Sequence, residues 1–96
     1  MSEPLNTTAI ADALAGLPGW THGEDRLKKT FTFADFSAAL GFIVRVGLEA
    51  EKLGHHPELF NVYNRVELAL CTHDADGKVT DKDVRLAKRV ESLGAV

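Results

Sequence analysis

The sequence is poor in cysteine, and Cys71 is the single residue of that type among 96. One cysteine cannot form a disulfide within the chain, so a reducing compartment is expected. An excess of basic residues is also missing, because 11 Lys and Arg residues stand against 14 Asp and Glu residues, for a formal net charge of −3. Without a cluster of cations to neutralise phosphates, direct binding to nucleic acid is not expected.

Long apolar runs are absent as well. The N-terminal segment carries no basic leader and no stretch of signal-peptide or membrane-spanning length, so we expect a cytoplasmic protein that does not bind membranes. The length fits one domain, and residues 1–96 are interpreted as that domain. A chain of this size buries only about 60 to 65% of its extended surface, which favours self-association.

Helices are predicted at both ends of the chain. Near the N-terminus, a polar cap at residues 6–8 precedes an apolar pattern that the segment GLPG at 16–19 ends. Near the C-terminus, Thr80 is the expected cap of a helix with an apolar face. The residues of that face are Val84, Leu86, Ala87, Val90 and Leu93.

Two antiparallel strands are predicted after the first helix, at residues 20–22 and 26–33, around a turn at 23–25. Apolar residues alternate along the second strand, but Lys29 interrupts their face, which indicates a position near a sheet edge.

The longest predicted helix runs to about Leu53, and Thr32 with Asp35 forms a capping-box pattern before it. Two parallel apolar rows along this helix indicate packing on the sheet and also against another subunit; a wide, one-sided contact with the core is the alternative. The first row is Phe36, Leu40, Val44 and Leu48, and the second is Ala39, Ile43, Val46, Ala50 and Leu53.

After Pro57, residues 59–63 and 65–73 form a predicted hairpin that turns near Asn64. The order of elements is therefore α-β-β-α-β-β-α, which is typical of a two-layer α+β sandwich.

The segment KLGHHP allows two interpretations of His55 and His56. Gly54 and Pro57 are common where a helix ends, so the histidines can simply complement the negative end of that helix. Alternatively, the helix end and His73, at the end of the hairpin, can meet at one rim of the domain. Three imidazoles there would supply proton donors and acceptors near neutral pH.

A metal site is disfavoured because adjacent histidines cannot easily point at one ion and no His-x-x-x-His spacing is present. Cys71 is interpreted as a small packed side chain, not a nucleophile.

The stretch from Phe36 to Asp83 resembles the pterin-4a-carbinolamine dehydratase family, also called 4a-hydroxytetrahydrobiopterin dehydratase or dimerisation cofactor. The resemblance extends from about Trp20 to the final helix. It implies a four-stranded antiparallel sheet with three helices on one face. The motif positions are Glu51, His55, His56, Pro57, Tyr63, His73 and Asp83.

This resemblance implies a hydro-lyase that removes water from 4a-hydroxytetrahydropterin to give quinonoid dihydropterin, in tetrahydrobiopterin recycling, without a metal or another cofactor. His55, His56 and His73 would be catalytic, with His55 and His73 favoured as the acid–base partners and the choice between acid and base left open. Glu51 and Asp83 would orient the imidazoles. The implied substrate-binding residues are His55, His56, Pro57, Thr72, His73, Asp74 and Ala75.

Family members also pair sheet edges into homodimers and form homotetramers through the long helix, and a functional link to an aromatic amino-acid hydroxylase is implied. A non-catalytic interaction module that acts through the long helix is the alternative function. Two departures stand out, because the family often has an acid where this chain has Gly54 and a tryptophan where it has Leu59. The first would alter imidazole orientation, and the second would loosen one wall of the cleft.

Overall fold

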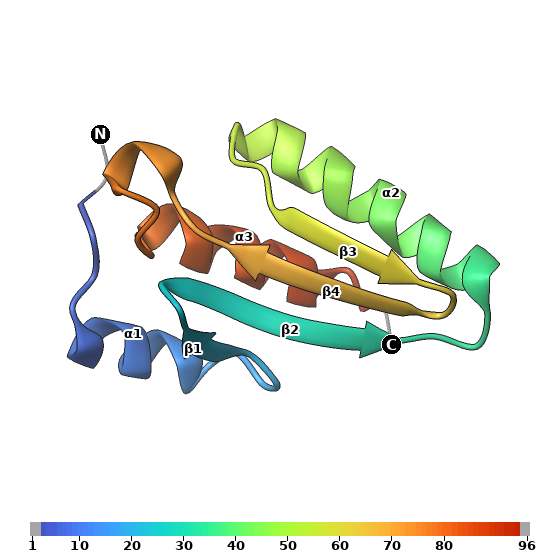
Figure 1. Ribbon diagram of the computed structural model, residues 1–96, viewed down its shortest axis with the longest axis horizontal. Coiled ribbons are helices and arrows are strands. Elements are labelled where there is room, and N and C mark those ends of the chain that lie inside the picture. Colours follow the sequence, from blue (N-terminus) through green and yellow to red (C-terminus); the bar gives the residue numbers. More distant parts are fainter. Residues whose placement is uncertain (1–2, 95–96) are drawn as a thin grey trace.

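A computed structural model describes residues 3–94 of the chain (Figure 1). The elements follow the predicted order α-β-β-α-β-β-α, with a four-stranded antiparallel sheet, which confirms the α+β fold class. Their bounds are α1 Thr7–Leu14, β1 Thr21–Gly23, β2 Arg26–Thr32, α2 Phe36–Leu53, β3 Glu58–Val62, β4 Arg65–Leu70, the 3-10 helix η1 His73–Ala75 and α3 Asp81–Ser92.

The strands lie in the order β1-β2-β4-β3, and all neighbours are antiparallel. The prediction that β2 lies near a sheet edge is therefore only partly right. On one side β1 pairs with β2 no further than Lys28, but on the other side β4 pairs with β2. Lys29 itself is accommodated on the apolar face because its Nζ donates to Pro18 O and to Glu91 Oε2. The cation thus meets a carboxylate of α3 instead of lying unpaired against the core.

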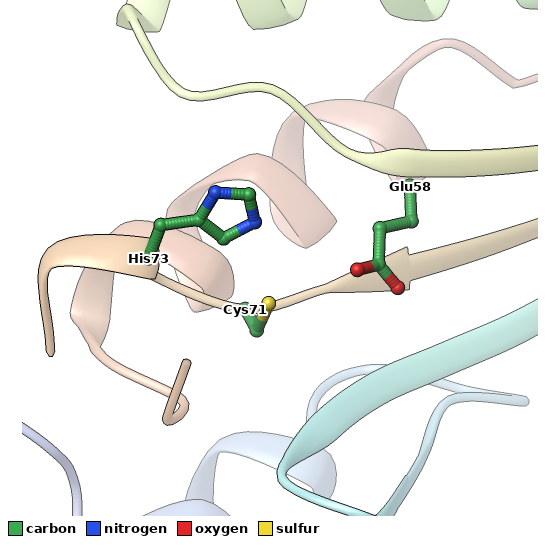
Figure 2. A group of neighbouring side chains, drawn as sticks. All are labelled: Glu58, Cys71 and His73. Carbon is green, nitrogen blue, oxygen red and sulfur yellow. The ribbon is translucent and has the colours of Figure 1, made fainter. Parts of the chain in front are cut away.

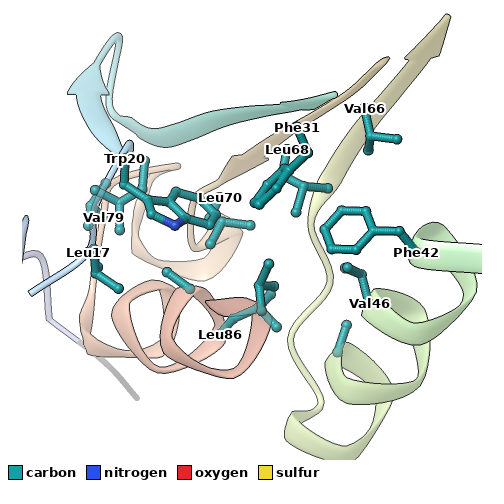
Figure 3. Packing of buried hydrophobic residues seen from close by; sticks show 14 of the residues in the cluster. Leu17, Trp20, Phe31, Phe42, Val46, Val66, Leu68, Leu70, Val79 and Leu86 are labelled. Carbon is teal, nitrogen blue, oxygen red and sulfur yellow. The ribbon is translucent and has the colours of Figure 1, made fainter. Parts of the chain in front are cut away.

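One hydrophobic core lies between the sheet and the helices (Figure 3). Alternation in β4 turns every second residue inward, and Phe42 of α2 packs against Phe31 and Phe33 with ring centroids 4.7 and 5.0 Å apart. Ile10 of α1 joins the same cluster, so the three helices cover one face of the sheet. The buried residues of α2 and β4 in this core are Ala39, Phe42, Val46, Ala50, Val66, Leu68 and Leu70.

The other apolar row of α2 remains outside this core. Its four side chains are 46 to 59% exposed in the described chain. The wide, one-sided core contact considered for the long helix is therefore wrong, because none of these four residues belongs to the core or packs against it. The exposed row is Phe36, Leu40, Val44 and Leu48.

The helix caps differ in one place from the prediction. Asp35, not Thr32, is the N-cap of α2, and its carboxylate accepts from Ala38 N at 2.8 Å. Thr32 cannot take that role because it is the last residue of β2. Gly54 does end α2 in the left-handed conformation, with φ at 63°. Thr80 caps α3 as expected.

The second hairpin is shorter than predicted. It turns at Tyr63 and Asn64, and β4 ends at Leu70 instead of continuing to His73. Thr72 makes only an isolated bridge to Lys78, after which the chain coils into η1. His73 consequently lies on a short 3-10 helix and not on a strand. No helix within residues 3–94 is long and apolar enough to cross a membrane.

Candidate active site

A cavity of about 370 Å³ lies where the end of α2, the end of β4 and the start of α3 meet. All three predicted catalytic histidines line it, although they come from segments 17 or more residues apart in the chain. The lining residues are Gly54, His55, His56, Cys71, Thr72, His73, Asp74 and Lys82.

His55 is held firmly at the inner side of this cavity. Because Gly54 takes the left-handed conformation, the chain turns back and His55 N donates to Ala50 O. The ring nitrogen Nε2 then lies 2.5 Å from Asp83 Oδ1. The side chain of His55 is 11% exposed and that of Asp83 is fully buried, so this pair is shielded from water.

The carboxylate of Asp83 is held by further hydrogen bonds. Thr80 N and Thr72 Oγ1 both donate to Oδ2 at 2.9 Å, and the two threonine hydroxyls lie 2.7 Å apart. The first of these contacts belongs to the capping box that starts α3. The carboxylate of Asp83 therefore takes part in the capping box of α3 and also orients the imidazole of His55.

His56 has a different environment. Its Nε2 lies 2.7 Å from Glu51 Oε1, one turn back on α2, and both side chains are largely exposed, at 64 and 79%. Such a pair is screened by water and salt, so it constrains the imidazole far less than the buried pair does.

His73 lies at the outer side of the cavity, near Cys71 and Glu58 (Figure 2). Ligand atoms of these three side chains lie within 4.8 Å of one another, which is a possible metal-binding arrangement. However, Arg26 binds both oxygens of Glu58, at 2.7 and 2.8 Å, and holds the pKa of that carboxyl below its usual range. Burial raises the pKa of the Cys71 thiol. A carboxylate already paired and a protonated thiol fit a metal poorly.

Two of the predicted substrate-binding residues do not line the cavity. Ala75 is buried in the core side of η1, and Pro57 is half-buried beside the site. Leu59, expected at one wall of the cleft, instead borders a neighbouring hollow that includes Arg26 and Glu58.

Sequence reasoning missed Lys82 and the contribution of Cys71 to the cavity wall. Lys82 directly precedes Asp83 in the first turn of α3, so its place beside the motif aspartate was a usable signal. Cys71 is buried as a small packed residue, as expected, and it also reaches the cavity.

The sequence of this chain is similar to those of other proteins over nearly its whole length. A sequence profile of the family described as Pterin 4 alpha carbinolamine dehydratase matches residues 3–93. Proteins from Rhizobium rhizogenes and Opitutus terrae, both named "Putative pterin-4-alpha-carbinolamine dehydratase", are 52 and 50% identical to it. These matches cover 97 and 100% of this chain and 93 and 99% of the two relatives.

Solved structures agree with the sequence matches. The crystal structure of a transcriptional coactivator/pterin dehydratase from Brucella melitensis is 40% identical, with a TM-score of 0.87 over 93% of this chain and 96% of that one. A pterin dehydratase-like protein described as a RuBisCO assembly factor in the alpha-carboxysome is 22% identical, with a TM-score of 0.65 over 78 and 88%, and supports the fold alone. This chain therefore belongs to the pterin-4-alpha-carbinolamine dehydratase family.

Proposed function

We propose that this protein is a hydro-lyase that dehydrates 4a-hydroxytetrahydropterin to quinonoid dihydropterin, as a step of tetrahydrobiopterin recycling. The observation that carries the proposal is the buried pair of His55 and Asp83, which opens on a cavity that His56 and His73 also line. An imidazole fixed by a buried carboxylate is an arrangement suited to proton transfer. Membership of the dehydratase family supplies the substrate class.

The reaction needs two proton transfers and no redox step. The proton on N5 is removed, its electrons form the N5=C4a bond, and the C4a oxygen leaves as water after it gains a proton. Each well-placed acid or base contributes roughly 10²- to 10⁴-fold to such a reaction. Histidines suit both transfers near neutral pH, so the proposed chemistry requires neither a metal nor another cofactor.

The cavity has the size and polarity that a pterin needs. Its volume of about 370 Å³ falls in the range of small-molecule pockets, roughly 300 to 1,000 Å³. Asp74 adds a carboxylate to the imidazoles, and Thr72 lines the wall although its hydroxyl is bonded to Asp83 and Thr80. A pterin ring carries several hydrogen-bond donors and acceptors. We propose that these side chains bind the ring, with Pro57 and Ala75 supporting the wall from behind.

A stopped-flow assay on enzymatically generated 4a-carbinolamine tests this function. The purified protein should accelerate the loss of water over the spontaneous rate, and treatment with a chelator should leave the acceleration unchanged. His22, on β1 and outside the cavity, offers a matched control, because His22→Ala should keep the full rate. A wild-type protein that does not accelerate the reaction would refute the proposal.

We further propose that a second copy of this chain covers the exposed apolar row of α2, giving a homodimer or homotetramer. The row repeats every fourth residue along an 18-residue helix, so two antiparallel copies can pack the same face together. The edge strand β3 adds exposed apolar side chains, among them Phe60 and Val62, that a paired sheet edge would cover. A single small core leaves these surfaces uncovered.

Light scattering on matched variants tests the assembly. Val44→Glu with Leu48→Glu places two charges in the exposed row and should lower the mass by at least half at micromolar concentration. Arg45→Glu, an exposed polar position on the same helix, should not change it. A monomeric wild-type protein would contradict the assembly.

A role in binding another protein is the second candidate function, and the same exposed row favours it. A wild-type monomer without dehydratase activity would leave this role as the interpretation of the row. The cytoplasmic location and the link to an aromatic amino-acid hydroxylase remain predictions.

A further inference from the structure

The two ring nitrogens of His55 have different neighbours. Nε2 faces Asp83 Oδ1 at 2.5 Å, whereas Nδ1 has no hydrogen bond to any residue between 3 and 94. His55 also lines the cavity. Nδ1 is therefore the ring nitrogen that remains for a bound molecule, and its protonation state decides what His55 can do.

The protons around Asp83 can be assigned from the hydrogen bonds. Thr72 donates its one hydroxyl proton to Asp83 Oδ2, so the 2.7 Å contact between the two threonine hydroxyls must use the proton of Thr80. Thr80 Oγ1 in turn accepts from Lys82 N at 3.2 Å. The backbone N–H of Thr80 points at Oδ2 as well.

Thr72 Oγ1 and Thr80 N both direct a proton at Oδ2, which is the arrangement that suits an ionised carboxylate, and Oδ1 then needs one further donor. The side chain is fully buried, so water cannot supply one. Asp83 acts as an acceptor-only carboxylate, and the group that completes it must be a donor. That donor is His55 Nε2–H.

We propose that Thr72 and Thr80 are positioning residues that act through Asp83: they hold its carboxylate so that neutral His55 carries its proton on Nε2 and presents the bare Nδ1 to the cavity. His55 is then the base of the reaction. This identification of the base rests on the proposed dehydratase function, whereas the position of the proton rests on the hydrogen bonds to an ionised Asp83.

In the dehydration, Nδ1 of His55 takes the proton from N5, the N5=C4a bond forms, and the C4a–O bond breaks. The departing oxygen takes its proton from a second imidazole that enters protonated, and leaves as water. Asp83 stabilises the imidazolium that forms on His55. The acid is then His73, the favoured partner of His55, while His56 assists binding.

Asp83→Asn provides a sharp test because the threonine donors decide how an amide would sit. Two donors at the Oδ2 position require the carbonyl oxygen of the amide there, which turns its NH₂ group toward His55 Nε2. Nε2 must then accept, and the proton of neutral His55 moves to Nδ1. The cavity-facing nitrogen changes from an acceptor to a donor without a change in side-chain volume.

The experiment is ¹H–¹⁵N NMR of the histidine ring nitrogens in the full chain, at a pH where the imidazoles are neutral, with His55 assigned from the spectrum of His55→Ala. The wild-type protein should show one tautomer with the proton on Nε2, and Asp83→Asn should show the proton on Nδ1. Thr72→Val should accelerate exchange of the Nε2 proton, and Thr72→Ser should restore slow exchange. Asp35→Ala removes the cap of a different helix and controls for lost stability, so it should leave the His55 signals unchanged.

The dehydration rate separates the proposed proton position on His55 from the proposed dehydratase function. Asp83→Asn should slow dehydration by about 10²- to 10⁴-fold, since a triad aspartate changed to asparagine loses roughly 10⁴-fold through the wrong tautomer. A wild-type tautomer on Nδ1, or unchanged signals in Asp83→Asn, would overturn the inference even in an active enzyme. The expected tautomers in a protein without dehydratase activity would refute the function and leave the proton assignment intact.

Discussion

Two adjacent histidines of this chain, His55 and His56, each contact a carboxylate, but the two pairs have different surroundings. His55 and Asp83 are shielded from water and held by two threonines, whereas His56 and Glu51 are exposed neighbours on one helix end. Both pairs have short contacts, at 2.5 and 2.7 Å. Burial and the second layer of hydrogen bonds, not the contact distance, therefore distinguish a fixed imidazole from a mobile one.

The largest expected difference between the two pairs is in rate. His55→Ala should lower kcat by at least about 10²-fold because it removes a base that acts only in the transition state. His56→Ala should mainly raise KM, since an exposed imidazole assists binding. Stopped-flow dehydration with circular dichroism as a check on folding measures both. Equal losses of kcat in the two variants would remove the distinction.

A second difference should appear in the free energy of unfolding. Asp83→Ala leaves donors on Thr72 and Thr80 without an acceptor and removes half of a capping box, which should cost about 2 to 4 kcal/mol. Glu51→Ala at the exposed pair should cost less than about 0.5 kcal/mol. Urea unfolding of both variants provides the values, and similar losses would mean that the exposed pair is also structural.

A smaller difference between the two pairs should appear in their response to ionic strength. The effect of Glu51→Gln on substrate affinity should shrink between low and high ionic strength, because dissolved salt weakens the interaction of exposed charges. The effect of Asp83→Asn should stay constant, because no solvent reaches that carboxylate. The measurement is KM for each variant across a salt series. If the effect of Asp83→Asn on KM changed with salt, the hydrogen bonds around Asp83 would have to open to water.

The smallest effect concerns a third carboxylate, Glu58, which is exposed like Glu51 but bound by Arg26 through both oxygens. Arg26 holds the pKa of Glu58 below its usual range, so this pair stabilises the fold above the unfolded pKa of about 4.3 and loses that effect as pH falls through the lowered folded value. Thermal unfolding should therefore show a small loss for Glu58→Gln at pH 7 that disappears in acid. A loss that grows on acidification would have the wrong sign for this ion pair.

Much of the fold follows from local patterns in the sequence. The hairpin after Pro57, the helix end at Gly54 and the cap at Thr80 are set by neighbouring residues, and each was predicted. The end of β4 was not, because Thr72 leaves the sheet to pair with Lys78 through a turn that apolar periodicity does not report. The cap at Asp35 was misassigned because Thr32 looks equally suitable until β2 is known to include it.

The candidate site depends more on tertiary structure. The motif residues were identified from the family resemblance, but the partner of each imidazole was not, because Asp83 reaches His55 across 28 positions of sequence. The clamp of Arg26 on Glu58 joins two strands that are not neighbours in the sheet. Lys82 was missed because a lysine in a first helical turn is usually a solvated charge.

In the proposed dehydration, His55 and Asp83 act as one unit. The most direct measurement is the stopped-flow dehydration rate of the wild-type protein, His55→Ala, Asp83→Asn and the double variant. We predict that the double variant is no slower than His55→Ala, because the carboxylate acts only through the imidazole that is already gone. Losses that multiply in the double variant would show that the two residues act independently, and a wild-type protein without acceleration would refute the proposed dehydration.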